Sequence, residues 1–297
     1  MRHAFDLHPN TPVWNEQVKL FSNACQAHNQ VSYLPRRTQN RFTENHFHCS
    51  TPRISHKISR QVGQDDATHC ANYPSVCEKY GSTQFNNEPD TDWSLPQNRR
   101  WVEQILKDWK SKHHPPIPLV IGGEVTTSPG HIGEGEDPSF PGIPLYHYSL
   151  ATEIQLNLAL ETAKKSEEKW SKSSLQERIH LLGNIANELR RHRADLIGVM
   201  VADTGKTVME ADVEVSEAID FADYYRTNIE EWHHLPDIEW KAKGTILIAP
   251  PWNFPCSIPA GGILAALATG NCVIFKPATE SVLVGWHLAQ IFWKAGI

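Results

Sequence analysis

The chain has 297 residues, with 40% hydrophobic and 21% charged residues and a formal net charge of −6. This composition is typical of a soluble globular protein with one large or two ordinary domains, and the acidic balance excludes a general nucleic-acid binder. With no apolar run near the ~20 residues that span a bilayer, no apolar secretory stretch and only six cysteines, we expect a cytoplasmic protein without a membrane span.

Residues 1–80 predict little regular structure. Trp14, Val18, Phe21 and Cys25 follow one another at helical spacing, which predicts a short amphipathic helix. The remainder is polar and has neither a strand nor a helix period. Because such a segment cannot bury enough apolar surface to offset its ordering entropy, we expect an irregular or disordered N-terminal region.

Histidines and cysteines are concentrated in this same region. Their spacing matches no familiar zinc motif, so we expect no metal site. A metal-binding module formed by residues 1–80 stays an alternative. The residues that would carry it are His46, His48, Cys49, His69, Cys70 and Cys77.

Residues 81–150 are predicted to form a proline-rich connector with little core of its own. Nine prolines interrupt it and exclude long helices. A short helix fits within residues 98–110, with Trp101, Ile105 and Trp109 on one face. Residues 117–121 are a candidate strand.

Three amphipathic helices are predicted after residue 150. The first has Leu156, Leu160, Ala163 and Trp170 near one inward face. A capping box at residues 174–177 opens the second, because a serine oxygen and a glutamate carboxylate three residues apart can satisfy each other's amides. The third covers about residues 210–232. Its predicted inward positions are Val215, Ile219, Ala222 and Tyr225.

The hydrophobic pattern then changes to short apolar runs. Residues 244–249 and 272–275 read as buried strands, residues 258–268 as a buried helix between them, and a last helix runs through Leu288 and Trp293. Strand, helix, strand and helix with short connections predict the start of a parallel α/β sheet.

The residues that can carry chemistry follow these two strands. Prolines flank Trp252, Asn253 and Phe254, and they stiffen a loop at the carboxyl end of a strand, where α/β sheets place ligands. An asparagine fixed there can direct its amide N–H at an oxyanion. Lys276 ends the next strand, where its ammonium can reach a ribose or a phosphate. The residues alone also allow a simpler interpretation, in which the loop is a rigid turn with packed aromatic side chains and Lys276 is solvated. The sequence has no Gly-x-Gly-x-x-Gly motif that would by itself indicate a dinucleotide site.

Three segments in this order resemble the aldehyde dehydrogenase superfamily: Ile-Ala-Pro-Pro-Trp-Asn-Phe-Pro at 248–255, Ala-Leu-Ala-Thr-Gly-Asn at 266–271 and Phe-Lys-Pro-Ala-Thr-Glu-Ser at 275–281. The resemblance covers roughly residues 145–297. It implies an incomplete α/β aldehyde dehydrogenase fold, in which residues 151–297 form the N-terminal portion of the nucleotide-binding domain. It also implies that Asn253 donates to the thiohemiacetal oxyanion, that Trp252 walls the cofactor pocket and that Lys276 touches the adenosine ribose.

Two further segments narrow the resemblance. Residues 85–101 and 205–225 resemble a connector and a helix of the glutamate-semialdehyde dehydrogenase module of bifunctional proline utilization A. The substrate implied is L-glutamate γ-semialdehyde, the open form of pyrroline-5-carboxylate, which is oxidised to glutamate with NAD. Phe254 and Glu217 are then candidates to line the substrate pocket. For Glu217, a solvated helix face is the alternative.

Two departures from the family pattern qualify this implication. The family's nucleophilic cysteine and its glutamate would lie beyond Ile297, and Cys256 is expected to pack as a small apolar residue. We therefore expect a fragment that is inactive alone; the alternatives are a non-catalytic remnant and a subunit that pairs with a complementary chain or with a second copy. Many members have a glutamate at the position of Thr279, whereas this chain has Glu280, which leaves NADP open beside NAD.

Overall fold

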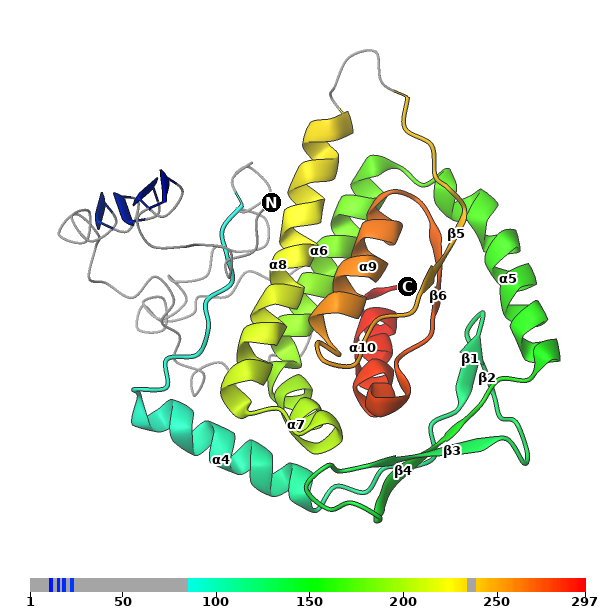
Figure 1. The fold of residues 1–297 in the computed structure, drawn as a ribbon. Coiled ribbons are helices and arrows are strands. Elements are labelled where there is room, and N and C mark those ends of the chain that lie inside the picture. The colour runs from blue at the N-terminus through cyan, green and yellow to red at the C-terminus, as the bar shows by residue number, and fades with distance from the viewer. Residues whose placement is uncertain (1–10, 13–14, 17, 20–21, 24–84, 234–238) are drawn as a thin grey trace, which may run out of the picture. The chain divides into compact units, whose positions relative to one another are not determined.

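The computed structural model describes residues 11–12, 15–16, 18–19, 22–23, 85–233 and 239–297 (Figure 1). The chain divides into two units, Met1–Thr38 and Gln39–Ile297. In the first unit, residues 12, 15–16, 18–19 and 22–23 are helical, in agreement with the short helix predicted there. The histidines and cysteines of the alternative metal-binding module lie outside the described residues.

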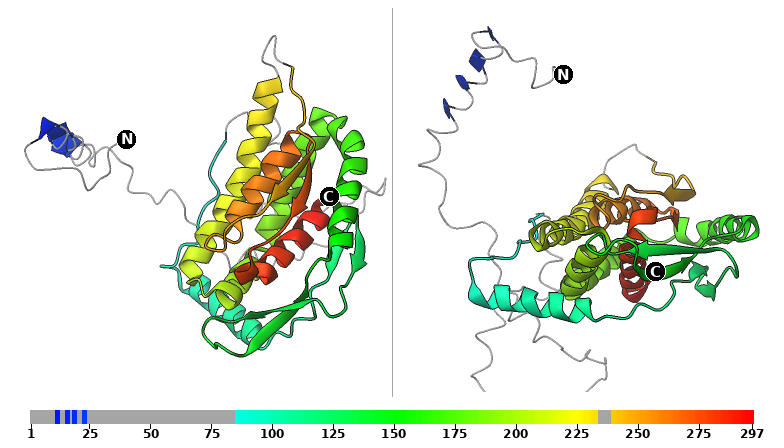
Figure 2. Two further views of the ribbon diagram at one scale, coloured as in Figure 1. Left: turned by 45° about the vertical axis from the view of Figure 1, so that its right-hand side comes forward. Right: turned by 60° about the horizontal axis from the view of Figure 1, so that its bottom comes forward.

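Most of the described core residues of the second unit come from five helices: α6 (Leu175–Arg191), α7 (Arg193–Thr204), α8 (Val208–His233), α9 (Ser257–Ala268) and α10 (Val282–Ala295). Figures 1 and 2 show α6, α8 and α9 side by side, with α10 beside α6 and α7. Side chains such as Leu182, Ile219 and Leu264 are fully buried between them. Within the described residues, none of the helices combines the length and the apolar character that crossing a membrane requires.

The sequence did not predict α7. Four of its side chains, Leu196, Ile197, Val199 and Met200, are fully buried although they fall on different sides of the helix. A helix that is buried all around has no polar face, so it lacks the period of 3.6 residues by which the other helices were recognised. The other predicted helices of this region are present, and the predicted segment 210–232 extends over Val208–His233.

The predicted capping box at the start of α6 is confirmed. The Ser174 hydroxyl accepts the Glu177 amide at 3.2 Å, and the Glu177 carboxylate accepts the Ser174 amide at 2.7 Å. The preceding helix, α5 (Glu153–Ser171), begins with a second capping box formed by Thr152 and Gln155. These reciprocal bonds satisfy amides that have no partner inside the first turn of a helix.

The inward face predicted for α5 is wrong. Leu156 and Leu160 are 54% and 46% exposed, whereas Ala163 is buried. Apolar residues occur at every second position from residue 154 to residue 160, so they point to more than one side of the helix and the pattern could not identify its buried face. In Figure 1, α5 stands at the edge of the second unit, beside the two parallel strands rather than inside the helical core.

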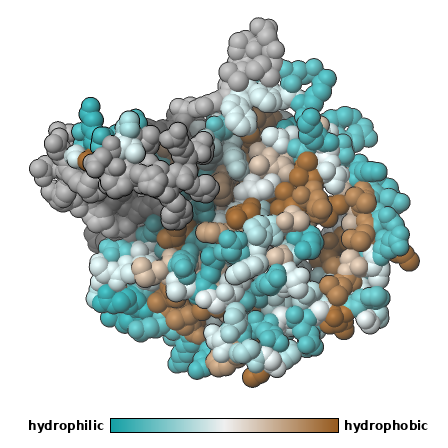
Figure 3. Space-filling model, viewed as in Figure 1, coloured by the Kyte–Doolittle hydropathy of each residue, from teal (hydrophilic) through white to brown (hydrophobic). Residues whose placement is uncertain are grey.

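The predicted start of a parallel sheet is confirmed. Strands β5 (Thr245–Ile248) and β6 (Cys272–Phe275) pair in parallel, with α9 connecting them. The prediction that both strands are buried is wrong, because β6 is only half-buried throughout and Leu247 of β5 is 62% exposed. In the part of the chain that the structure describes, this sheet consists of these two strands. Figure 3 shows hydrophobic side chains gathered on the face over β5, between α9 and α5.

Residues 85–150 contain more regular structure than a linker. They form α4 (Pro96–Lys110) and two antiparallel hairpins, β1 (Leu119–Ile121) with β2 (Glu124–Thr126) and β3 (Ile132–Glu136) with β4 (Pro144–Ser149). The turn of the first hairpin is Gly122–Gly123, both with positive φ, as a two-residue type I′ turn requires. Trp101, Ile105 and Trp109 of α4 lie on the common face predicted for them and pack into the main core.

A buried ion cluster holds the extended segment before α4 on the helices. The Glu88 carboxylate forms ion pairs with Arg190 at 2.8 Å and with Arg193 at 3.2 Å. Arg193 forms a second ion pair with Asp212 at 2.9 Å. Asp212 in turn accepts the Thr91 amide at 2.7 Å. Because each buried charge has an opposite partner, the segment docks without leaving an uncompensated charge in the interior.

Candidate functional site

The loop after β5 and the residue after β6 lie at the same edge of the parallel pair. The Lys276 amide donates to the Ile248 carbonyl at 2.9 Å, which keeps the carboxyl ends of the two strands level. Residues 249–256 leave from β5 at this edge, and Trp252 there is 52% exposed. Asn253 and Lys276 are also exposed. This is the position at which parallel α/β sheets bind ligands.

A buried glutamate fixes the far end of that loop. Glu214 of α8 is 1% exposed, and its Oε1 accepts the Cys256 amide at 2.6 Å and the Ser257 amide at 3.0 Å. Lys206 lies 3.1 Å from its other carboxylate oxygen. Burial raises the pKa of the Glu214 carboxyl, against the opposing effect of these amides and of Lys206. This carboxylate therefore binds the amide of the N-cap residue Cys256 and the first amide of α9.

Sequence reasoning missed Glu214 and Lys206, although α8 contained a signal for the first. Ala211 and Ala218, three residues before and four residues after Glu214, are both fully buried. That helical spacing places the carboxylate on the apolar face. A glutamate on such a face needs a partner, because an unpaired buried charge is strongly unfavourable.

The two predicted substrate residues come from different elements. Phe254 of the loop is 43% exposed, and the Lys206 ammonium lies 4.5 Å from the centre of its ring, a cation–π arrangement. Glu217 is exposed on α8, one turn after Glu214. Burial is the main cause that raises the pKa of Cys256, and the Glu217 charge adds to it from this neighbouring turn of α8. The roles of Phe254 and Glu217 stay predictions.

Neither of the two cysteines that the structure describes has the properties of a nucleophile. Cys256 is fully buried, as expected for a small packed residue, and burial raises the pKa of its thiol well above the ordinary value, with the Glu214 charge adding to the effect. Burial also raises the pKa of Cys272. A high pKa keeps a thiol protonated at neutral pH, whereas the thiolate is the reactive form.

The exposed side chains at this edge include a cation and an aromatic ring. Lys276 is exposed and has no ion pair in the part of the chain that the structure describes, so its ammonium is available to a ribose or a phosphate. The exposed Trp252 ring offers an apolar surface at the same edge. Glu280 lies in the short 3₁₀ turn Thr279–Ser281 and is exposed. Burial raises the pKa of Tyr148 on β4, and the Glu280 charge adds to this effect.

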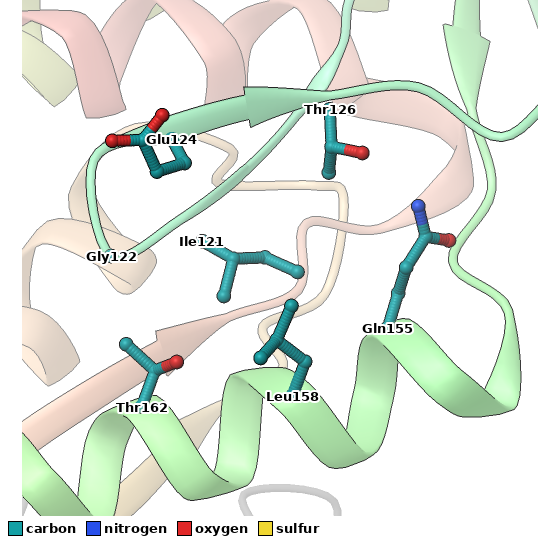
Figure 4. Close-up of a pocket in the computed structure, with 7 residues that line it drawn as sticks. All are labelled: Ile121, Gly122, Glu124, Thr126, Gln155, Leu158 and Thr162. Atoms are coloured by element: carbon teal, nitrogen blue, oxygen red, sulfur yellow. The ribbon is translucent and has the colours of Figure 1, made fainter.

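A pocket of about 300 Å³ lies elsewhere, between the β1–β2 hairpin and α5 (Figure 4). Ile121 and Leu158 supply its apolar part, and polar side chains surround them. None of its lining residues belongs to the edge formed by Trp252, Asn253 and Lys276. In the residues that the structure describes, no group of three or more histidine, cysteine or acidic side chains is placed to hold a metal ion.

The model of the aldehyde dehydrogenase family matches residues 130–297, more than half of the chain and including all of this edge. The chain belongs to the aldehyde dehydrogenase family. Among curated relatives, it is 33% identical over 223 residues to a 1-pyrroline-5-carboxylate dehydrogenase of Staphylococcus epidermidis and 30% identical to one of Geobacillus, and 72% of this chain is covered in both cases.

Solved structures of this dehydrogenase family show the same likeness. A 1-pyrroline-5-carboxylate dehydrogenase from Thermus with bound NAD is 30% identical with a TM-score of 0.68, and proline utilization A from Bdellovibrio bacteriovorus is 29% identical with a TM-score of 0.69. Each comparison covers 72% of this chain. The chain spans 43% of the length of the curated relatives and of the Thermus enzyme, and 23% of the proline utilization A chain.

Proposed function

We propose that this chain carries the oxyanion-donating and adenosine-binding parts of an NAD-dependent dehydrogenase that oxidises L-glutamate γ-semialdehyde to glutamate. The observation that carries the proposal is the shared carboxyl edge of β5 and β6, where Asn253 and Lys276 leave adjacent strands. The likeness to pyrroline-5-carboxylate dehydrogenases over the same residues supports the substrate class.

Asn253 is suited to stabilise the negative charge that forms on the aldehyde oxygen when a thiolate adds to it. An amide held by a stiff loop needs no reorganisation at that moment, which is the basis of oxyanion stabilisation. Lys276 would hold the adenosine ribose, and Trp252 would wall the same pocket. NAD, when bound, supplies the hydride acceptor for the oxidation.

The substrate carries an ammonium and a carboxylate as well as the aldehyde. Glu217, exposed on α8 near the end of the loop, would attract the ammonium, and the half-exposed Phe254 ring would pack on the aliphatic chain. The supporting features are the complementary charge and the position of Phe254 directly after Asn253 in the loop.

We infer that the chain alone does not turn over, because burial raises the pKa of both cysteines in the described residues, Cys256 and Cys272, and so keeps their thiols protonated. In this proposal a cysteine nucleophile and a base for deacylation come from the part of the dehydrogenase that corresponds to the uncovered length of the relatives, either in one polypeptide or in a complementary chain. The NAD-binding and oxyanion roles of this chain can still be measured separately.

The first experiment measures NAD binding by the purified chain with isothermal calorimetry. Lys276→Ala should raise the Kd for NAD, while Lys243→Ala should not, because the equally exposed Lys243 lies before the amino end of β5. If both variants bind NAD like the wild type, the ribose role of Lys276 is wrong. Repeating the titration with NADP determines which cofactor is preferred.

The second experiment measures aldehyde oxidation after the complementary half of a related dehydrogenase has been supplied. Asn253→Ala should lower kcat by about a hundredfold or more, as loss of an oxyanion donor does, and should leave the Kd for NAD unchanged. An unaltered kcat under conditions where the chemical step limits the rate would remove Asn253 from the site.

A further inference from the structure

The loop that carries Asn253 is held at both of its ends. At the first end, the strand pair fixes Ile248 through the Lys276 amide. At the second end, the chain enters α9, and Glu214 accepts the Cys256 and Ser257 amides. Between the two ends, Pro250, Pro251 and Pro255 restrict the backbone. The direction of the Asn253 amide therefore depends on where these two ends are placed.

The second end has no local cap of its own. Helix α9 begins after Cys256, and the Cys256 side chain makes no capping hydrogen bond. Both Cys256 and Ser257 are fully buried, so their amides have no access to water. One oxygen of Glu214, which stands 42 residues earlier in the chain, accepts both amides. Without that acceptor, two buried donors would be unsatisfied.

Helix α8 therefore presents two carboxylates to the same region, one turn apart. Glu214 points inward to the backbone of the loop, whereas Glu217 is exposed beside it. Lys206 completes the arrangement, because it lies 3.1 Å from the inner carboxylate and 4.5 Å from the centre of the Phe254 ring. A single ammonium thus connects the Glu214 anchor with the aromatic residue next to Asn253.

We propose that Glu214 is a positioning residue for the Asn253 loop: its carboxylate holds the Cys256 and Ser257 amides and, through Lys206, the Phe254 ring. The functional half of this statement rests on the oxyanion role proposed above for Asn253. Glu214 itself does not contact substrate in this proposal. It fixes the distance between α8 and the loop, and so the distance between Glu217 and Asn253.

The test uses Cys256 as a reporter, because its thiol is buried and its own amide is one of the two that Glu214 holds. The purified chain is labelled with N-ethylmaleimide under native conditions, and the modified peptide is quantified by mass spectrometry. Two variants of similar size separate hydrogen bonding from packing. Glu214→Met fills the space without accepting a hydrogen bond, and Glu214→Gln keeps an acceptor oxygen.

Glu214→Met should raise the labelling rate of Cys256 by about ten- to hundredfold, the factor that an unsatisfied buried donor implies. Glu214→Gln should label nearly as slowly as the wild type. Cys272 of β6 is the internal control and should keep its rate in every variant, and Glu230→Gln on the same helix controls for the loss of a charge. Equal rates in the wild type and Glu214→Met, or equally raised rates in both Glu214 variants, would overturn the proposal.

A second measurement covers the case in which Glu214→Met unfolds and Cys272 labelling rises too. In the wild-type chain, hydrogen exchange at the Cys256 and Ser257 amides should be slower than at the exposed Trp252 and Asn253; equal exchange would also overturn the anchor. In the complemented enzyme, Glu214→Met should lower kcat and leave the Kd for NAD unchanged, with recovery in Glu214→Gln. The two proposals can fail separately. If Cys256 labels slowly in the wild type and Asn253→Ala has no effect on kcat, the proposed function is rejected and the positioning role of Glu214 is retained.

Discussion

Asp203 provides a sharp test of how burial controls the stability of this fold. It lies in the last turn of α7, is 3% exposed, and accepts hydrogen bonds from the Tyr146 hydroxyl of β4 at 2.8 Å and from the Val284 amide of α10 at 3.0 Å. The carboxyl therefore connects three elements and caps the first turn of α10. Burial raises the pKa of Asp203 from 3.8 to about 7, although the two donors act in the opposite direction.

The direction of the pH dependence follows from which state binds the proton. Between the unfolded pKa of 3.8 and the folded pKa of about 7, the folded chain keeps the Asp203 proton and the unfolded chain has lost it. The contribution of Asp203 to the free energy of unfolding is therefore largest at acidic pH. Between these two pKa values it decreases by about 1.4 kcal/mol per pH unit. From about pH 4.5 to about pH 8, the loss is about 3 kcal/mol, a large share of a typical free energy of unfolding.

Asp203→Asn removes this dependence, because the amide stays neutral and still offers an oxygen to Tyr146 or Val284. The free energy of unfolding is measured by urea titration with circular dichroism at about pH 4.5 and about pH 8. Between these two pH values, the value for the variant should rise by about 3 kcal/mol relative to that of the wild type. Asp108→Asn, at an exposed position of α4, is the control and should show no such gain. If the stability difference between Asp203→Asn and the wild type is the same at both pH values, the carboxyl is ionised throughout and the reasoning from burial is refuted.

Two further changes test the packing of the same unit. Arg193→Met should lower the free energy of unfolding by about 3–5 kcal/mol, because two buried carboxylates lose their shared cation; Arg191→Met at the exposed neighbouring position should change it by about 0.5 kcal/mol or less in the same urea titration. Gly198→Ala places a methyl group 2.1 Å from the Trp109 ring and should cost about 1–3 kcal/mol. Thermal melts and near-ultraviolet circular dichroism measure this second effect, and an unchanged tryptophan signal with an unchanged melting temperature would show that α4 is not packed tightly on α7.

Features determined by residues close together in the chain could be predicted from the sequence. The capping box of Ser174 and Glu177 spans one turn, and the common face of Trp101, Ile105 and Trp109 repeats every four residues. The order of strand, helix and strand around residues 244–275 likewise predicted that the loop with Asn253 and the residue Lys276 would meet at one sheet edge.

Other features depended on which segments meet in space. The leucines of α5 occupy more than one side of their helix, so only the position of the neighbouring strands determined that Ala163 is buried and Leu156 is exposed. Helix α7 is surrounded by other helices and therefore lacks the polar face that reveals a helix in a sequence.

The sequence by itself determined the chemical groups of the candidate site, namely the asparagine, the lysine and the stiff loop between prolines. The tertiary structure alone decided what holds that loop, since the two amides at its end are satisfied by Glu214, 42 residues away from Cys256. Helical and strand periods relate residues within a few positions of one another, whereas a buried donor takes whichever acceptor the fold brings to it. For that reason, Glu214 could be identified as the acceptor of these two amides only from the packing of α8 against α9 in the tertiary structure.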